Sequence, residues 1–95
     1  MFDELDRVLH QPIRTRIIAY LLSKDGADFS EIKTALGLSD GHMTTHMREL
    51  LASEYVAAHK TTLHGKSNTK YTVTQAGKDA FKAYINTLKR IIEFE

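Results

Sequence analysis

Residues 30–53 read SEIKTALGLSDGHMTTHMRELLAS, and this stretch decides the fold. Ser30 is placed to cap a first short helix, whose inward positions are Ile32, Ala35 and Leu36. Gly37 can adopt the positive φ that a tight turn between helices needs. Ser39 is placed to cap a second helix, with one apolar face made of Met43, Met47, Leu50 and Leu51. The stretch therefore predicts two helices joined by a short, rigid turn.

A β-hairpin is expected directly after the second helix. Two strand-like runs, 56–62 and 69–73, flank a turn with the sequence His64-Gly65-Lys66-Ser67-Asn68. Residues 27–29 form a brief extended piece that could pair with the hairpin as a third strand. Two helices, a tight turn and a basic hairpin are the outline of a winged helix-turn-helix.

Further helices are predicted on both sides of this unit. An apolar stripe before Pro12 indicates a short N-terminal helix, formed by Phe2, Leu5, Val8 and Leu9. Pro12 suits the first turn of the next helix, which ends at Gly26, a good left-handed cap, and has a core face of Ile13, Ile17, Leu21 and Leu22. Thr74 is expected to cap a long final helix, and Gly77 lets that helix lie close against the body.

The predicted class is mainly α with a small β-hairpin (α+β). Residues 1–95 are expected to form one winged helix domain, with the helix-turn-helix at about 30–53, the wing at about 56–73 and the C-terminal helix at about 75–95. With 95 residues and 42% hydrophobic content, an independent enzyme is a poor expectation. No apolar run or leader pattern is present, so we expect a cytoplasmic protein with no membrane partner. The absence of cysteine excludes disulfides and thiolate metal sites.

The net charge is only +1, but the charge is sorted along the chain. Residues 1–31 carry four basic and six acidic side chains, whereas residues 32–70 carry five and three. Between residues 55 and 70 there is no acid, and the basic side chains are Lys60, Lys66 and Lys70, with His59 and His64 beside them. Local positive potential attracts phosphate more than the total charge does, so the hairpin is suited to duplex DNA.

The second helix of the pair has an outward face that suits the same partner. Opposite Met43 lie Gly41, Thr45, Arg48 and Ala52, with His42 and Thr44 on the flanks. Small and hydrogen-bonding residues near a helix N-terminus let the backbone approach DNA, and Thr and Arg can contact base edges or phosphates. A solvated surface helix could carry the same residues. Gly41 favours the interpretation as a DNA-binding face. Glycine in a first helical turn lowers helix stability by up to about 1 kcal/mol, and a close approach of the backbone to DNA would give a reason for this cost.

Three segments together resemble the stand-alone winged helix regulators of the MarR/ArsR type, in particular a small subgroup without an effector domain. They are residues 36–50 (LGLSDGHMTTHMREL), residues 54–56 (EYV) and residues 70–77 (KYTVTQAG). The resemblance covers nearly the whole chain from Pro12. It implies that the helix after the turn enters the major groove, that the wing touches backbone or minor groove, and that the terminal helices build a homodimer. Carried over by position, the groove residues are Asp40, Gly41, His42, Thr44, Thr45 and Arg48, and the wing residues are Lys60, His64, Lys66 and Lys70.

The C-terminal helix carries an apolar ridge suited to pairing. Phe81, Tyr84, Leu88 and Ile91 follow an a/d heptad spacing, and Ile85 and Ile92 widen the stripe. The ridge could pack within the monomer against Phe2, Leu5 and Leu9. We expect instead that these nine residues form a dimer interface across a two-fold axis. A homodimer would present two recognition helices one DNA turn apart, about 34 Å, and so select a pseudo-palindromic site. The resemblance also implies a transcriptional regulator that represses by occluding a promoter.

Three alternatives carry less weight. His42 and His46 stand four residues apart, a spacing that can hold a metal, but no cysteine or suitably spaced carboxylate completes a set, so no metal site and no cofactor is predicted. A protein-interaction module without a DNA role is supported by the nearly neutral total charge. A ligand- or metal-responsive regulator is hinted at by Tyr20 and Tyr84, although aromatic residues at helical spacing are usually core, and any small-molecule effector stays unknown.

Overall fold

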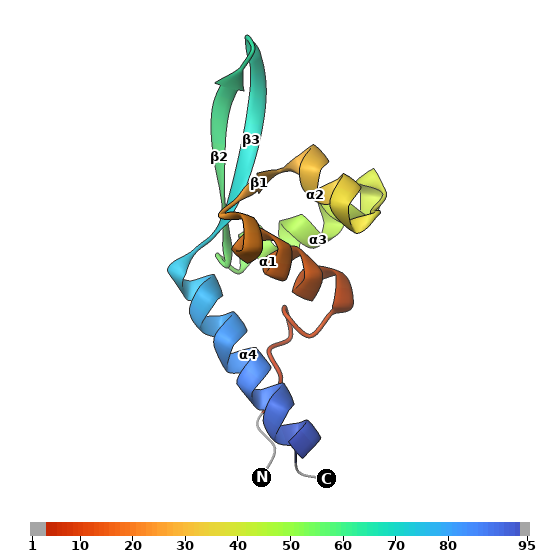
Figure 1. The fold of residues 1–95 in the computed structure, drawn as a ribbon, viewed down its shortest axis with the longest axis vertical. Helices are drawn as coiled ribbons and strands as arrows, with labels where there is room; N and C mark the ends of the chain where they lie inside the picture. Colours follow the sequence, from red (N-terminus) through yellow and green to blue (C-terminus); the bar gives the residue numbers. More distant parts are fainter. Residues whose placement is uncertain (1–3, 94–95) are drawn as a thin grey trace.

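The computed structural model describes residues 4–93 and shows four helices and a three-stranded antiparallel sheet (Figure 1). The elements are α1 (Pro12–Lys24), β1 (Ala27–Asp28), α2 (Phe29–Leu36), α3 (Asp40–Ala52), β2 (Val56–Leu63), β3 (Lys66–Val73) and α4 (Gln75–Glu93). The extents are 54 × 25 × 22 Å, because the wing and α4 project in opposite directions from the body formed by α1, α2 and α3 (Figure 1). The predicted α+β winged helix class is confirmed.

The first part of the chain differs from the expectation. Residues 4–10 contain no α-helix; instead the Asp6 carboxylate accepts hydrogen bonds from the backbone N–H groups of Val8 and Leu9, at 2.9 and 3.0 Å. A short acidic side chain can satisfy backbone donors locally in this way and so competes with helix formation. Leu9 is nonetheless fully buried. Phe2, the first residue of the expected stripe, lies outside the described residues.

Helix α1 begins at Pro12, as predicted, and supplies much of the core. Gln11 caps it by accepting a hydrogen bond from the Arg14 backbone N–H. Its buried residues are Ile17, Ile18 and Leu21, whereas Leu22 is 39% exposed, so the predicted inclusion of Leu22 in the core face was wrong. The left-handed cap is Asp25, with φ 57°, and Gly26 follows it with φ 105°.

The helix-turn-helix has the predicted turn and one shifted boundary. Helix α2 is capped by Asp28 rather than Ser30, because the Asp28 carboxylate accepts from the Glu31 N–H at 2.8 Å. Gly37 takes the expected positive φ of 66° between the two helices. Ser39 caps α3 by accepting from the backbone N–H of His42 at 3.1 Å. Ala35 is exposed rather than inward-facing, so α2 contributes Ile32 as its buried residue.

The sheet has the order β1-β3-β2, and the expected third strand is present. The hairpin strands run closer to the tip than the sequence indicated. Val56 pairs with Val73, and the pairing continues to Leu63 and Lys66. His64 and Gly65 alone form the turn, with φ values of 52° and 77°, which is the two-residue geometry that follows the twist of the strands.

Helix α4 is anchored where it leaves the sheet. Thr74 caps it by accepting from the Gly77 N–H at 3.0 Å, as predicted, and donates to the Glu54 carbonyl at 2.7 Å. A Cβ atom at Gly77 would lie 2.2 Å from the Tyr55 carbonyl oxygen, so glycine is required for this close contact. Further along, Tyr84 is 6% exposed and belongs to the core.

Candidate nucleic-acid interface

Helix α3 has one face in the core and the opposite face in solvent. Met43, Met47 and Leu50 are buried at 2% exposure or less. The predicted groove residues are all exposed: Asp40, Gly41, His42, Thr44, Thr45 and Arg48. Because the buried side chains fix the rotation of the helix, Gly41, Thr45 and Arg48 lie opposite Met43 on its free face, and Asp40 lies at its N-terminal end.

The N-terminal turn of α3 is open on its outer side. No heavy atom lies within 4 Å of a Cβ built on Gly41, so packing within the described chain gives no reason for glycine there. Lys33 makes an ion pair of 2.7 Å with Asp40, which offsets the one acidic side chain at this end of the helix. A helix N-terminus with free backbone N–H groups and no side chain in the way can receive a phosphate oxygen.

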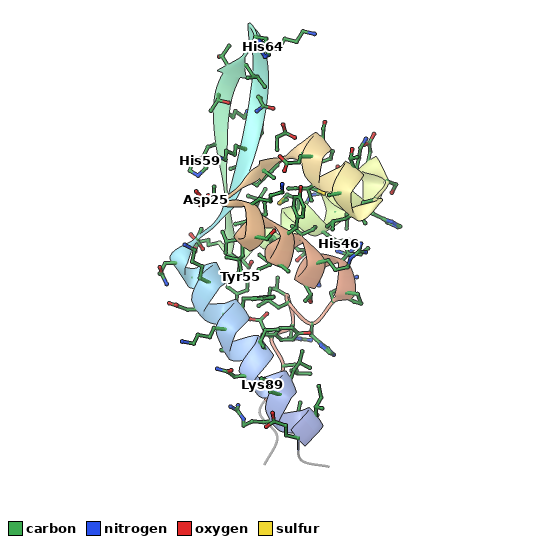
Figure 2. All side chains as sticks on the ribbon, viewed as in Figure 1. Asp25, His46, Tyr55, His59, His64 and Lys89 are labelled. Atoms are coloured by element: carbon green, nitrogen blue, oxygen red, sulfur yellow. The ribbon has the colours of Figure 1, made fainter. Side chains whose placement is uncertain are left out.

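The wing divides its basic side chains between two faces. Cross-strand partners share a face, and Lys60 pairs with Thr69 while His59 pairs with Lys70 and Leu63 with Lys66. Lys66 and Lys70 therefore lie on the same face, and Lys60 lies on the other. The Lys60 face continues into the body as Val56, which is buried against the core. His64 stands at the far tip, exposed (Figure 2).

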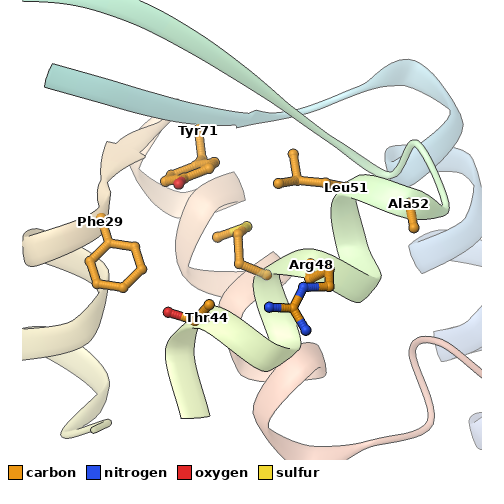
Figure 3. A pocket seen from close by; sticks show the side chains of 7 residues that line it. Phe29, Thr44, Arg48, Leu51, Ala52 and Tyr71 are labelled. Atoms are coloured by element: carbon orange, nitrogen blue, oxygen red, sulfur yellow. The ribbon is translucent and has the colours of Figure 1, made fainter. Parts of the chain in front are cut away.

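An open pocket of about 550 Å³ lies between α3 and the sheet (Figure 3). Its lining comes from α3, the start of α2 and β3, and consists of Phe29, Thr44, Met47, Arg48, Leu51, Ala52 and Tyr71. Burial raises the pKa of the Tyr71 phenol. Thr44 and Arg48 thus border an apolar hollow on the side of α3 that faces the wing.

A cationic side chain from α1 reaches the other flank of α3, a contact that the sequence did not predict. Arg14, on α1, donates from Nε to the Val8 carbonyl at 2.6 Å and from a terminal nitrogen to His46 Nδ1 at 3.2 Å. The rings of His46 and His42 are 6.5 Å apart between centroids. Burial, and then the charge of Arg14, lower the pKa of His46. Helical periodicity places Arg14 off the core face of α1, but it carries no information about which element the side chain reaches.

The sequence matches the winged helix DNA-binding domain family over residues 13–92. The chain belongs to that family. It is 29% identical over 79 residues to the uncharacterized protein MJ0432 of Methanocaldococcus jannaschii, a match that spans 83% of this chain and 86% of the relative.

Solved structures show the same winged helix architecture. A transcriptional regulator homologue from Pyrococcus horikoshii has a TM-score of 0.85 and 28% identity, over 93% of this chain and 87% of its own. MarR has a TM-score of 0.76 at 13% identity, over 87% of this chain and 60% of its own. PadR of Bacillus subtilis, solved with operator DNA, has a TM-score of 0.68 at 17% identity, over 79% of this chain and 47% of its own. The latter two likenesses concern the fold alone, and the predicted resemblance to MarR-type regulators is confirmed at the level of the fold.

The apolar residues of this winged helix chain that were expected at a dimer interface fall into two groups. Leu9 and Tyr84 are buried inside the monomer, at 0% and 6% exposure. The others with described side chains keep some exposed surface: Leu5, Phe81, Ile85, Leu88, Ile91 and Ile92. Ile85 and Ile92 are 36% and 69% exposed and lie seven residues apart, on the same side of α4. Tyr84 instead lies 3.1 Å from His10, between its hydroxyl and Nδ1.

Among residues 4–93, no group of three His, Cys, Asp or Glu side chains is arranged to hold a metal ion. His42 and His46 remain a pair with no third ligand in that part of the chain. No helix of the same residues is long and apolar enough to cross a membrane.

Proposed function

We propose that this chain is a sequence-specific, double-stranded DNA-binding transcriptional regulator that acts as a homodimer and represses by occluding a promoter. The observation that carries the proposal is the exposed side of α3, where six exposed residues lie along the first nine residues after a capped helix N-terminus. Membership of a DNA-binding family supports it, as does the operator complex of a protein with the same fold.

Each part of α3 has a physical role in this proposal. Arg48 supplies the strongest base or phosphate contact, because guanidinium groups bind guanine edges and phosphates through two hydrogen bonds. Thr44 and Thr45 contribute weaker hydrogen bonds or contacts to thymine methyl groups. The turn around Gly41 receives a phosphate through its backbone N–H groups.

The wing adds affinity that depends on salt. Lys60 lies on the face that continues toward the core and α3, so it has the shorter path to a duplex held against α3. Lys66 and His64 act at the tip, and Lys70 lies lower on the opposite face, where its side chain passes Gly26. Every lysine that replaces a phosphate counterion makes binding weaker as salt rises.

The homodimer rests on the exposed apolar side of α4. Leaving Ile92 and Ile85 in water in every molecule is unfavourable, and a second copy would bury them across a two-fold axis. Because Leu9 and Tyr84 are already buried in the monomer, the exposed isoleucines would contribute more to the interface.

Selection from a random pool of duplexes tests the proposal most directly. A dimer of this kind should enrich a pseudo-palindrome with half-sites about one helical turn apart. Enrichment of no sequence, with binding that is weak and equal on all duplexes, would contradict the specific regulator and favour a protein-interaction role.

Sedimentation tests the dimer separately. The wild type should be dimeric at about ten micromolar, well above a typical dimer constant, and an Ile85→Glu, Ile92→Glu double variant should be monomeric. Ala83→Glu, which adds one of these two charges at an exposed position on another side of α4, should stay dimeric. A monomeric wild type would remove the α4 interface from the proposal.

A further inference from the structure

We propose that Arg14 and His46 form a phosphate-binding pair beside the recognition helix, in which Arg14 positions the imidazole so that its Nε2–H donates to the DNA backbone. The inference rests on the proposed DNA-binding function. It adds a contact from α1 to an interface otherwise formed by α3 and the wing.

The hydrogen-bond chemistry fixes the tautomer of His46. A guanidinium has no acceptor, so the 3.2 Å contact requires the lone pair on His46 Nδ1 to accept from Arg14. In a neutral imidazole the proton is then on Nε2, the nitrogen on the far side of the ring from Arg14. The neutral form is favoured because burial and the neighbouring Arg14 lower the pKa of His46.

Arg14 is itself held in place. Its Nε donates to the Val8 carbonyl at 2.6 Å, in the segment that leads into α1. The two bonds use two of the five guanidinium N–H groups, which leaves donors and a full positive charge available on this flank. The pair is half-buried, so its geometry is better defined than that of a solvated lysine.

The pair lies next to residues already assigned to the DNA face. On α3, His46 is one turn from exposed His42, and their ring centroids are 6.5 Å apart. Figure 2 shows His46 beside the N-terminal part of α1, away from the wing. The charged and titratable groups that influence His46 are Arg14 on α1 and His42 and Glu49 on α3, and Glu49 alone favours its protonation. Arg14 thus places a permanent positive charge beside the outer N–H group of His46, with Glu49 as the one carboxylate that acts on this ring.

Two substitutions separate a phosphate contact from a structural role. His46→Asn places an acceptor near the position of Nδ1, so it can keep the bond from Arg14 but loses the outer donor. His46→Gln places an amide N–H near the position of Nε2 and so keeps the outer donor. Binding is measured on the duplex enriched from the random pool, at about pH 8, where an ordinary histidine is neutral. His46→Asn should weaken binding by about threefold to tenfold for each half-site, and His46→Gln should weaken it by less.

Replacing single phosphates by neutral methylphosphonates identifies the contact. Wild-type binding should weaken at one phosphate in each half-site, and His46→Asn should be insensitive to the change at that phosphate while keeping its sensitivity elsewhere. Equal sensitivity of wild type and Asn at every phosphate would overturn the inference. So would a larger loss for Gln than for Asn, which would show that the role of His46 is to accept from Arg14.

A measurement on the wild type needs no variant. Nitrogen NMR shifts of the free protein should show the Nε2–H tautomer of His46, and the Nδ1–H tautomer would overturn the inference. If the wild type selects no duplex at all, the proposed function has failed. If it selects one but the Asn and methylphosphonate results are negative, only the Arg14–His46 contact has failed.

Discussion

Helix α3 and the outer part of the wing relate to the core in opposite ways. Helix α3 buries Met43, Met47 and Leu50, so the residues that hold it in place alternate with those that face outward. In the outer part of the wing, from residue 59 to residue 67, every side chain is exposed. Substitutions on α3 can therefore change fold and binding together, whereas those in the outer part of the wing should change binding alone.

Arg48→Ala should have the greatest effect on DNA affinity. Arg48 is exposed and borders the open pocket, so its loss leaves the buried face of α3 unchanged. A good bidentate contact contributes about 1–3 kcal/mol, and a dimer loses it twice, so affinity should fall by about thirtyfold or more. Fluorescence titration of the selected duplex measures this, with Arg90→Ala as a control that removes the same charge from the side of α4 away from Ile85 and Ile92. A loss no greater than the control's would show that α3 does not enter the groove as proposed.

Gly41→Ala should change stability and binding in opposite directions. Alanine favours a helix by about 0.5–1 kcal/mol over glycine, and the open space at this position leaves room for its methyl group. Urea unfolding should therefore show higher stability. Affinity should fall by about tenfold, because the methyl group would stand between the backbone and a phosphate.

Gly77→Ala is the matched substitution at a packed glycine. Its methyl group would collide with the Tyr55 carbonyl, so urea unfolding should show destabilisation of about 1–3 kcal/mol. Unchanged affinity in a stabilised Gly41→Ala variant would contradict the phosphate contact at the start of α3.

The junction between α3 and the wing should set the limit of stability at high pH. Tyr55 donates to an Asp6 carboxylate oxygen at 2.6 Å. This hydrogen bond, together with burial, raises the pKa of Tyr55 to about 12. Because the phenol ionises more easily in the unfolded chain, at about pH 10, the stability from this bond is present below that pH and is lost as pH rises toward 12. Tyr55→Phe should cost about 1 kcal/mol at neutral pH and flatten this alkaline loss in urea unfolding. A variant with an unchanged alkaline profile would show that another group titrates there.

The sequence predicted the elements of this fold better than their side-chain partners. Periodicity located α1, α3, α4 and the hairpin, because these depend on local spacing of apolar residues. The N-terminal stripe failed, because one carboxylate, Asp6, satisfies backbone donors in a turn instead. The same side chain receives the bond from Tyr55, 49 residues away. Contacts such as this one and Arg14–His46 depend on which helices meet, and local spacing carries no information about that.

The smallest expected effect is a difference in DNA binding between the two faces of the wing. Lys60 lies on the face that continues toward the core, and Lys70 lies on the opposite face. Both side chains are exposed, so alanine at either position should change unfolding little. If the duplex lies against α3 and the inner face of the wing, Lys60→Ala should weaken binding by a few fold and reduce the salt slope by about one, and Lys70→Ala should change both less. Equal effects would show that long side chains reach the backbone from either face, and a larger effect for Lys70 would place the duplex on the other side of the wing.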